Sequence, residues 1–397
     1  MTRSKTLKAV LIWTAGIAVS VLLLLFLAQQ FLGPEVKKLF VTEINKSLVS
    51  EVQIDDVQLS LIKDFPFASV RFSGVRIKEA VNPPTHQNLL TAGTISLRFS
   101  LWDLLQKKYR VKNIRLDNIE LGLRIYADGS DNFHFWKQSS SSGNQNFNFE
   151  LQRIVIHNMH VRFVNDAART FADAQLPAFV AKGNFNSSKY ELSLAGNIML
   201  RDFKSHGVSY ISDRNLNLWL LMDADNTTGF YNISKGEIET GKLKLSAAGS
   251  VVYSEKQKQV NLAVTASGST FGEMISLVPA KYVKSYEGYK FEGKGNISSK
   301  IAGVFGNGRL PSVMVRLEMQ NGNITERKSG IGLRGVSGLA VYQVQQDGAN
   351  EMLSISNLKA SLGKGFVSGS LSMHGFSAGF ALVFQPMVFR RRPSTAT

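Results

Sequence analysis

An eight-residue pattern of apolar alternation recurs along the chain, and it constrains the fold more than any other feature. In each copy two apolar residues alternate with polar ones, two polar or small residues follow, and the alternation then resumes. Copies begin at Val52, Val70, Ile114 and Ile154, and a weaker copy begins at Leu353. Strict alternation is typical of a strand with one apolar and one polar face.

The apolar step of three in the middle of each copy would turn a regular strand onto its other face. A β-bulge absorbs the extra residue and bends the strand, so that the apolar face continues. The alternative places a tight hairpin turn at each step, although arms of three residues are too short to pair well. We therefore expect a mainly β fold, a long, bent antiparallel sheet that forms an apolar groove, with a few short helices.

The copies in the first third of the chain, together with the strictly alternating run Ile95–Leu101, define the predicted lining of this groove. These candidate groove residues are Val52, Ile54, Val57, Leu59, Val70, Phe72, Ile95, Leu97, Phe99, Leu101, Ile114, Leu116, Ile119, Leu121 and Leu123. The competing interpretation is that the same face is an ordinary domain core.

The N-terminus predicts a membrane anchor. Residues 9–28 form an apolar run long enough to cross a hydrocarbon core of about 30 Å as a helix. A cleaved signal peptide is the alternative, but the apolar run is long and lacks a small-x-small cleavage site. Lys37 and Lys38 follow the span closely. The difference in positive charge between the two sides of the span, which normally sets its orientation, is therefore small. The simplest topology leaves residues 1–8 in the cytoplasm and exports the rest.

The chain has 397 residues, a net charge of +16 and no cysteine. The absence of cysteine excludes thiol catalysis, disulfides and cysteine-based metal sites. The positive charge favours anionic partners, and for an anchored chain lipid headgroups are favoured over nucleic acid. Alternatively, the cations are simply spread over solvent-facing strand positions.

Turn-forming residues every 8 to 12 positions or so predict an antiparallel all-β chain. A Ser/Gly/Asn-rich loop at 139–146 is the best candidate boundary. It separates a helix and β region at 33–138 from a repetitive β region at 147–385, which is followed by an atypical tail at 386–397. Short helices are expected at 34–48 and at 270–283.

Candidate catalytic and metal-binding groups are weak. His157 and His160 are three apart and are expected on opposite faces of a strand, so we predict no shared metal. Asp128 and Asp131 lie in a turn-rich stretch without the further oxygen ligands of a calcium loop. The glycine-rich segments 293–296 and 303–308 match neither a phosphate loop nor a Rossmann motif. No cofactor and no enzymatic activity are predicted.

One segment mixes aromatic and cationic residues, at 281–290. Such a segment can lie against lipid headgroups or stack on single-stranded nucleic acid. Ordinary half-buried strand and turn residues remain the favoured interpretation.

The order of several motifs resembles the AsmA family of Gram-negative envelope proteins, which is related to TamB and the bridge-like lipid-transfer proteins. The resemblance covers residues 1–385. The motifs are Val52-Gln-Ile54-Asp-Asp-Val57, Asp64-Phe65-Pro66, Asp128-Gly-Ser-Asp-Asn132-Phe133, Leu151-Gln-Arg-Ile154-Val-Ile156-His-Asn158, the segment 270–279, Gly303, the run Leu310–Leu317 and Gln320-Asn-Gly-Asn-Ile324. Two features depart from the family pattern: Phe133 replaces a frequent tryptophan, and the strand rhythm stops abruptly after residue 385.

The resemblance implies a single-pass inner-membrane protein with most of its chain in the periplasm. It implies a groove that conducts phospholipid and affects outer-membrane protein assembly. The expected partners are membrane phospholipids, the inner membrane and the outer-membrane assembly machinery, without nucleic acid. The alternative is a structural or interaction protein that modulates outer-membrane assembly without carrying lipid; an envelope enzyme such as a glycan hydrolase is a distant third.

Overall fold

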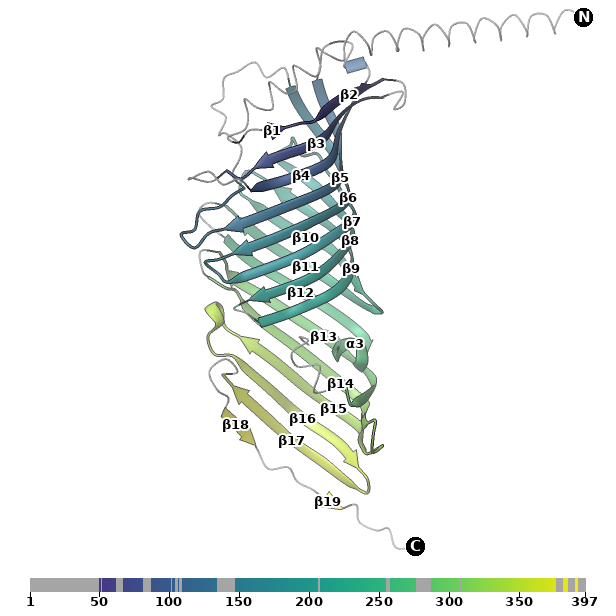
Figure 1. Cartoon of the computed structure of the whole chain (residues 1–397). Coiled ribbons are helices and arrows are strands. Elements are labelled where there is room, and N and C mark those ends of the chain that lie inside the picture. Colours follow the sequence, from purple (N-terminus) through teal and green to yellow (C-terminus); the bar gives the residue numbers. More distant parts are fainter. Residues whose placement is uncertain are drawn as a thin grey trace, which may run out of the picture. The chain divides into compact units, whose positions relative to one another are not determined.

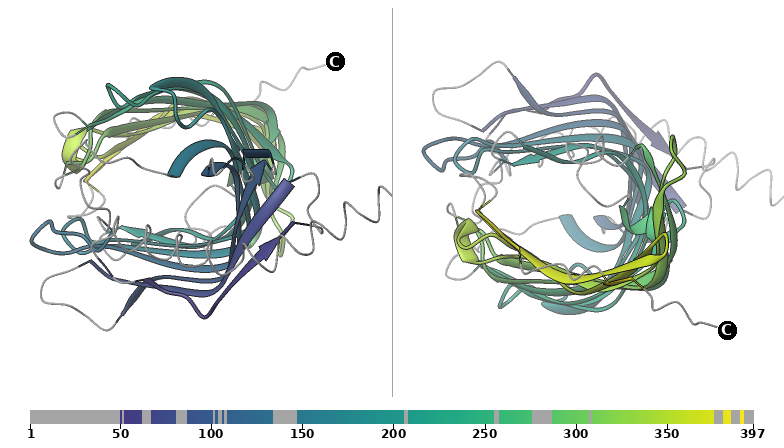
Figure 2. Two further views of the ribbon diagram at one scale, coloured as in Figure 1. Left: turned by 90° about the horizontal axis from the view of Figure 1, so that it is seen from above. Right: turned by 90° about the horizontal axis from the view of Figure 1, so that it is seen from below.

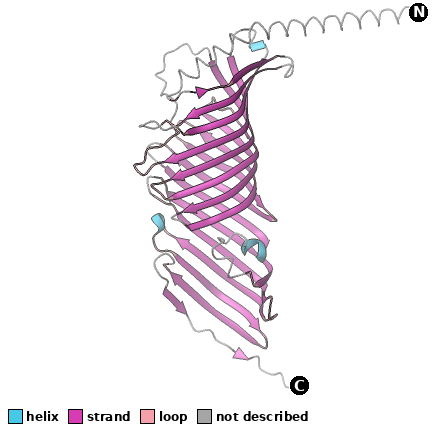
Figure 3. Ribbon diagram, in the orientation of Figure 1, coloured by secondary structure: helices cyan, strands magenta, loops and turns pink. Residues whose placement is uncertain are grey.

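Strands dominate the computed structural model, as Figures 1 and 3 show. The structure describes residues 50, 52–61, 67–80, 87–100, 102–103, 106, 109–133, 147–205, 208–254, 258–275, 287–306, 309–375, 381–384 and 390–391. All of its strands belong to one hydrogen-bonded sheet. The prediction of a mainly β chain built as one long sheet is therefore confirmed.

The first strands are β1 (Val52–Gln53), β2 (Asp56–Ser60), β3 (Phe67–Lys78), β4 (Asn88–Ser100), β5 (Tyr109–Ile125), β6 (Phe147–Asn165), β7 (Thr170–Lys182), β8 (Lys189–Ser205) and β9 (Val208–Asp225). The following elements are β10 (Phe230–Thr240), β11 (Leu243–Tyr253), β12 (Lys258–Thr270), α3 (Phe271–Ile275), β13 (Tyr289–Val304), β14 (Ser312–Glu326), β15 (Gly332–Val344), η1 (Gln346–Gly348), β16 (Met352–Leu362), β17 (Gly365–His374), β18 (Ala381–Phe384) and β19 (Arg390–Arg391).

The chain divides into two compact units. The first contains the described residues up to Arg124, together with Ser130–Val161 and Val180–Asn186. The second contains Ile125–Gly129, Arg162–Phe179 and the described residues from Ser187 onward. In both units sequence neighbours pair as antiparallel hairpins, for example β3 with β4 and β8 with β9. The views of Figure 2 show that the strands are bent, most clearly the yellow-green β16 and β17.

The strands β5 and β6 are an exception to the predicted antiparallel arrangement. Arg110 contacts Glu150, Asn118 contacts Asn158, and Glu120 contacts His160, each pair forty residues apart. A constant difference between partner numbers requires parallel strands, because antiparallel partners have a constant sum. A parallel pair needs a connection of a dozen or more residues, and the chain between β5 and β6 meets that requirement. The antiparallel prediction is therefore wrong at this pair.

The eight-residue copies lie within strands and do not form hairpins. The copies from Val70, Ile114 and Ile154 each fall inside one strand, and the copy from Val52 runs through β1 and β2. All of these copies place the two-residue step at the same level of the first unit. Asp56 pairs with Ser73, Ser73 with Thr94, and Thr94 with Asp117.

This alignment explains how the apolar face continues without a shift of register. The partner numbers of β3 and β4 stay in step from Phe67 to Ile77, so the predicted bulge is absent there. The two-residue step of each strand lies beside the step of the neighbouring strand. In three of these strands, β3, β5 and β6, a residue with positive φ provides the bend. These residues are Gly74 (φ 60°), Asn118 (φ 54°) and Asn158 (φ 53°).

The copy in β16 does contain the predicted bulge. Asn357 has φ 54°, and the register with β17 shifts between Ile355 and Leu358. Bulges of this kind also occur between β14 and β15 and between β9 and β10. The bulge interpretation is thus confirmed in the second unit and replaced by a shared step in the first.

Several predicted segments lie outside the described residues. They are the membrane span at 9–28, the helix at 34–48, the loop at 139–146 and, apart from β19, the tail at 386–397. In the described part of the chain, no helix combines the length and apolar character that crossing a bilayer requires. The helix expected at 270–283 is seen as α3, and residues 276–286 are not described.

Candidate apolar binding face

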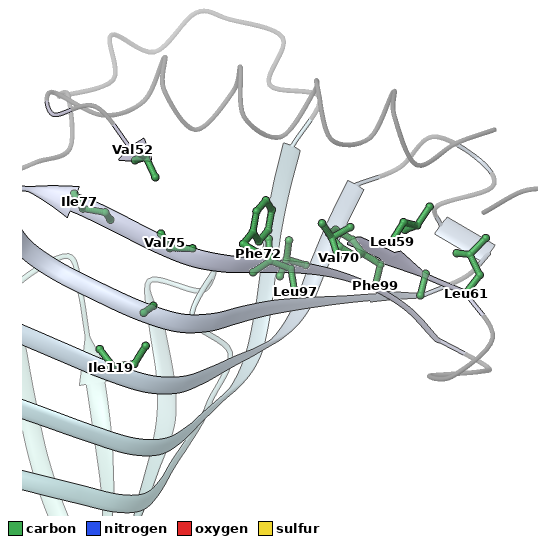
Figure 4. Packing of buried hydrophobic residues seen from close by; sticks show 13 residues of the cluster. Val52, Leu59, Leu61, Val70, Phe72, Val75, Ile77, Leu97, Phe99 and Ile119 are labelled. Carbon is green, nitrogen blue, oxygen red and sulfur yellow. The ribbon is translucent and has the colours of Figure 1, made fainter. Parts of the chain in front are cut away.

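Apolar side chains of β1–β5 form the larger of two buried clusters among the described residues. Its buried members include Val52, Leu59, Val70, Phe72, Leu97, Phe99 and Ile119, with Ile54, Val57, Ile95, Ile114, Leu116 and Leu121 partly buried against them. Figure 4 shows the labelled side chains of β3 and β4 on the same side of the ribbon. The structure therefore brings together nearly all of the predicted groove residues. Leu123 is partly buried outside this cluster, and the side chain of Leu101 is not described.

Burial varies across this cluster. Val70 in β3 and Phe99 in β4 are 0% exposed, so their side chains are fully packed. Ile114, Leu116 and Leu121 in β5 remain partly exposed. Fully packed and partly exposed positions therefore occur on both β4 and β5, since Val111 and Ile119 of β5 are also buried and Leu90 and Ile95 of β4 are not.

A further copy of the pattern, which is not obvious from the sequence, lies in β4. It reads Leu90-Thr-Ala92-Gly-Thr-Ile95-Ser-Leu97, and it pairs with β3 through Ile77↔Leu90, Val75↔Ala92 and Phe72↔Ile95. Alanine in one of its apolar positions hid the copy. The Gly-Thr pair at the step was the signal that could have revealed it.

A second apolar face, also absent from the predicted groove, runs across the second unit. One row of cross-strand partners passes from Leu218 to Ile238 and Leu245 in β9–β11. A further row passes from Ile297 through Leu317, Ala340 and Ile355 to Leu371, across β13–β17. Because directly paired residues share a face, these rows form a continuous apolar surface.

This second face is only partly buried at β8 and β9. Its residues there are Leu192, Leu194, Ile198, Leu216, Leu218, Leu220 and Met222, and all of them retain partial exposure. The other face of the same strands is mixed: Asn197 and Asn217 are exposed, and Asn197 donates to Asn217 Oδ1 at 2.6 Å, while Trp219 and Leu221 are partly exposed there. The first face is thus the more apolar of the two, and it is incompletely covered.

The short helix α3 packs on the same face at β11–β14. Phe271 and Met274 are buried against Leu243, Ala266 and Ile297. The ring of Phe271 also stacks on Phe291, with centroids 5.2 Å apart.

A capping box holds the start of this helix. Thr270 N donates to Glu273 Oε2 at 2.8 Å, and Glu273 N donates to Thr270 Oγ1 at 3.3 Å. A Cβ atom at Gly295 would collide with Glu318 O on the neighbouring strand and come within 2.8 Å of Met274 Cε. The absence of a side chain at Gly295 therefore leaves room for the backbone of β14 and for the Met274 side chain of the helix.

Two histidine–carboxylate pairs lie on the polar side of β5 and β6. His160 Nδ1 is 2.7 Å from Glu120 Oε2, and His157 Nδ1 is 3.2 Å from Asp117 Oδ1. Since Ile119 and Leu121 point into the apolar cluster, the carboxylates between and before them face away from it. The expectation that the two histidines lie on opposite faces is therefore wrong, because the step at Asn158 returns His160 to the side of His157.

The connection after β5 is held by one buried amide. Asn132 is 1% exposed; its Nδ2 donates to Glu79 Oε1 at 2.7 Å and to Gly122 O at 2.9 Å. Arg124 N donates to Asn132 Oδ1 at 2.8 Å. The neighbouring Asp131 accepts from Phe133 N at 3.1 Å, which is the predicted turn role.

A network of hydrogen bonds and an ion pair holds the turn between β15 and β16. Arg309 Nε donates to Asp347 Oδ2 at 2.8 Å, and Leu310 N donates to Asp347 Oδ1 at 2.9 Å. These bonds, together with that from the Gln346 amide, lower the pKa of Asp347 to about 2. Val304 N donates to Gln346 Oε1, and Gln346 Nε2 donates to Val304 O. These two bonds attach the turn to the end of β13.

Among the side chains that the structure describes, no three histidine, aspartate or glutamate residues converge as metal ligands. Comparison with protein-family models yields no match, and neither curated proteins nor solved structures match the chain.

Proposed function

We propose that this chain is a non-enzymatic protein whose apolar β-face shields the acyl chains of phospholipids. In this proposal residues 9–28 anchor it in the inner membrane of a Gram-negative cell, and the sheet stands in the periplasm. It would contribute there to phospholipid transport and outer-membrane biogenesis, as its resemblance to the AsmA family implies. Neither a cofactor nor a nucleic-acid partner enters this proposal.

The observation that carries the proposal is the partly exposed apolar face of the second unit. Leu194 and Leu220 are direct partners at its β8–β9 end, and neither is buried. Each CH₂ group removed from water contributes about 0.8 kcal/mol, so an acyl chain laid on such a face gains several kcal/mol. Contact with the face lowers the cost of moving a lipid through water without any chemical step.

The second candidate is a structural protein that influences outer-membrane assembly without carrying lipid. The complete burial of Val70 and Phe99 favours it for the first unit, because a closed core has no space for an acyl chain. The two candidates therefore differ in what they predict for the second unit.

Mass spectrometry of lipids that co-purify with the full chain distinguishes them. The informative variant is Leu194→Glu with Leu220→Glu, which places charge on the partly exposed apolar face. The matched control is Asn197→Glu with Asn217→Glu, on the other face of the same strands. Lipid lost only from the apolar-face variant, with both variants folded, supports acyl-chain binding. Absence of lipid from the wild type, or equal lipid in all three proteins, contradicts it.

A further inference from the structure

The hairpin ends of β13–β17 expose an unusual combination of side chains. Tyr289 at the start of β13, Ile331 before β15, and Leu362 and Phe366 around the β16–β17 turn are 41%, 65%, 38% and 36% exposed. Each belongs to the small set of large apolar residues that the described chain leaves in contact with solvent. We define them, with the cations around them, as the tip patch.

These residues lie at one edge because their strands are neighbours. Phe366 pairs with Ser361, next to the Leu362–Gly365 pair, so its side chain lies on the opposite face from that of Leu362. Tyr289 pairs with Glu326 across β13 and β14, and the turn that follows Glu326 carries Ile331. Leu333, two residues further on, pairs with Leu362, which pairs with Gly365. The β14–β15 and β16–β17 turns lie on the same edge of the sheet, at the right in Figure 1.

The same ends are rich in positive charge. The cations within residues 287–290, 326–334 and 361–366 are Lys290, Arg327, Lys328, Arg334 and Lys364, and the carboxylates are Glu287 and Glu326. Lys290 pairs with Glu292 at 2.6 Å, and Arg327 donates to Tyr289 O at 3.3 Å. Lys328, Arg334 and Lys364 are exposed, and no ion pair joins them to a described carboxylate.

The opposite ends of these strands are better matched in charge. Arg309 there pairs with Asp347, and the exposed apolar residues are Val304 and, beside the end of β13, Tyr253 with Lys258 over its ring. At the edge that carries the tip patch, four exposed large apolar residues occur together with three exposed cations that no ion pair joins to a described carboxylate.

We infer that the tip patch docks on the surface of an anionic phospholipid bilayer. Exposed aromatic and aliphatic side chains insert at the headgroup boundary, while lysine and arginine attract anionic headgroups. An acidic protein would match the cations but would leave Ile331, at 65% exposure, without an apolar site. Docking requires no acyl chain on the apolar face, so it stands independently of the proposed lipid binding.

The patch also continues the apolar face to its edge. Tyr289 lies two residues from Phe291 in β13, so it keeps the side of this partly buried neighbour, and Ile331 lies two residues before the partly buried Leu333. The Tyr289 and Phe291 rings are 6.5 Å apart. A bilayer bound here would touch the apolar face directly.

The absence of cysteine permits a local test with the full chain held in a non-ionic amphipol. Ser329→Cys, in the β14–β15 turn, would carry an environment-sensitive fluorophore. Ala349→Cys, at the other end of β15, would carry the same label as a control. Vesicles of phosphatidylcholine with phosphatidylglycerol should shift the emission of the first label to the blue and leave the second unchanged, and pure phosphatidylcholine should act weakly.

Changing Arg327, Lys328 and Lys364 together to glutamine should weaken this binding on the order of 100-fold. The triple change Lys189→Gln, Lys258→Gln and Lys300→Gln removes equal charge away from the patch and should have little effect. Equal shifts of both labels, equal response to neutral vesicles, or equal losses in the two triple variants would overturn the inference. Failure of vesicles to shift the first label would overturn it too and would leave an acidic protein as the candidate partner.

Discussion

The side-chain amide of Asn158 donates to Asn118 Oδ1 at 2.7 Å, across two parallel strands and at the same level of the sheet. Both asparagines have positive φ, and both occupy the second position of a two-residue step. The bond therefore joins the bends of β5 and β6, and it keeps the apolar residues of both strands on one side.

Replacing Asn118 by valine should destabilise the first unit by about 1–3 kcal/mol, because a β-branched residue is strained at positive φ. Asn118→Gly tolerates the conformation and loses only the side-chain bond, which should cost less. Urea denaturation of both variants measures the difference. A valine variant as stable as the glycine variant would show that the bend does not constrain this residue.

The buried amide of Asn132 provides a second prediction. Asn132→Leu removes three hydrogen bonds to Glu79, Gly122 and Arg124, and it should lower the free energy of unfolding by about 2–4 kcal/mol. Asp131→Ala removes the turn bond from Phe133 N and should cost about 1 kcal/mol or less. Chemical denaturation of the pair tests this order, which the opposite ranking would contradict.

The attachment of α3 depends on Phe271. Phe271→Ala should cost about 3 kcal/mol, because it removes a nearly buried ring that stacks on Phe291. Met274→Leu conserves volume and should cost less than about 1.5 kcal/mol. Hydrogen exchange at the amide of Glu273 is the local measurement, and it should accelerate in the alanine variant alone. Unchanged exchange in that variant would mean that the capping box holds the helix without the ring.

Acid should loosen the turn between β15 and β16. Since folding lowers the pKa of Asp347 from its ordinary 3.8 to about 2, its contribution is complete above pH 4 or so and is lost as the pH falls toward 2. In Asp347→Asn this pH dependence should disappear.

Stability of the two proteins compared from pH 5 down to pH 2 provides the test. The difference between them should shrink steadily over that interval. A difference that stays constant throughout would show that the carboxylate charge does not stabilise the turn.

Much of the first unit could be predicted from alternation alone. The side assignments of Val70, Phe72, Leu97 and Leu116 follow from a period of two, because a half-buried strand must separate apolar from polar residues. The bends at Asn118 and Asn158 were predicted in position, though the mechanism differs. A bulge is a property of one strand, whereas the shared step depends on neighbours that a single sequence segment does not specify.

Other features depend on long-range pairing. Nothing local distinguishes a parallel from an antiparallel neighbour for β6, since the apolar pattern of Ile154–Val161 is nearly symmetric in both directions. The apolar face of β8–β17 was missed because Gly196, Gly236, Ala340 and other small residues interrupt the alternation within individual strands. The surface is nevertheless continuous, because the apolar residues of neighbouring strands are paired in rows across the sheet.

The parallel junction of β5 and β6 has a consequence for the order of folding. Pairs such as β3–β4 and β8–β9 bring together residues that are close in sequence, so each can zip from its own turn. β5 and β6 must instead close a loop of forty residues between partners such as Asn118 and Asn158. Closing this loop costs conformational entropy of the chain, and the cost arises before the contacts between the two strands can compensate it. We therefore expect this junction to form late, after the hairpins on either side of it have already assembled.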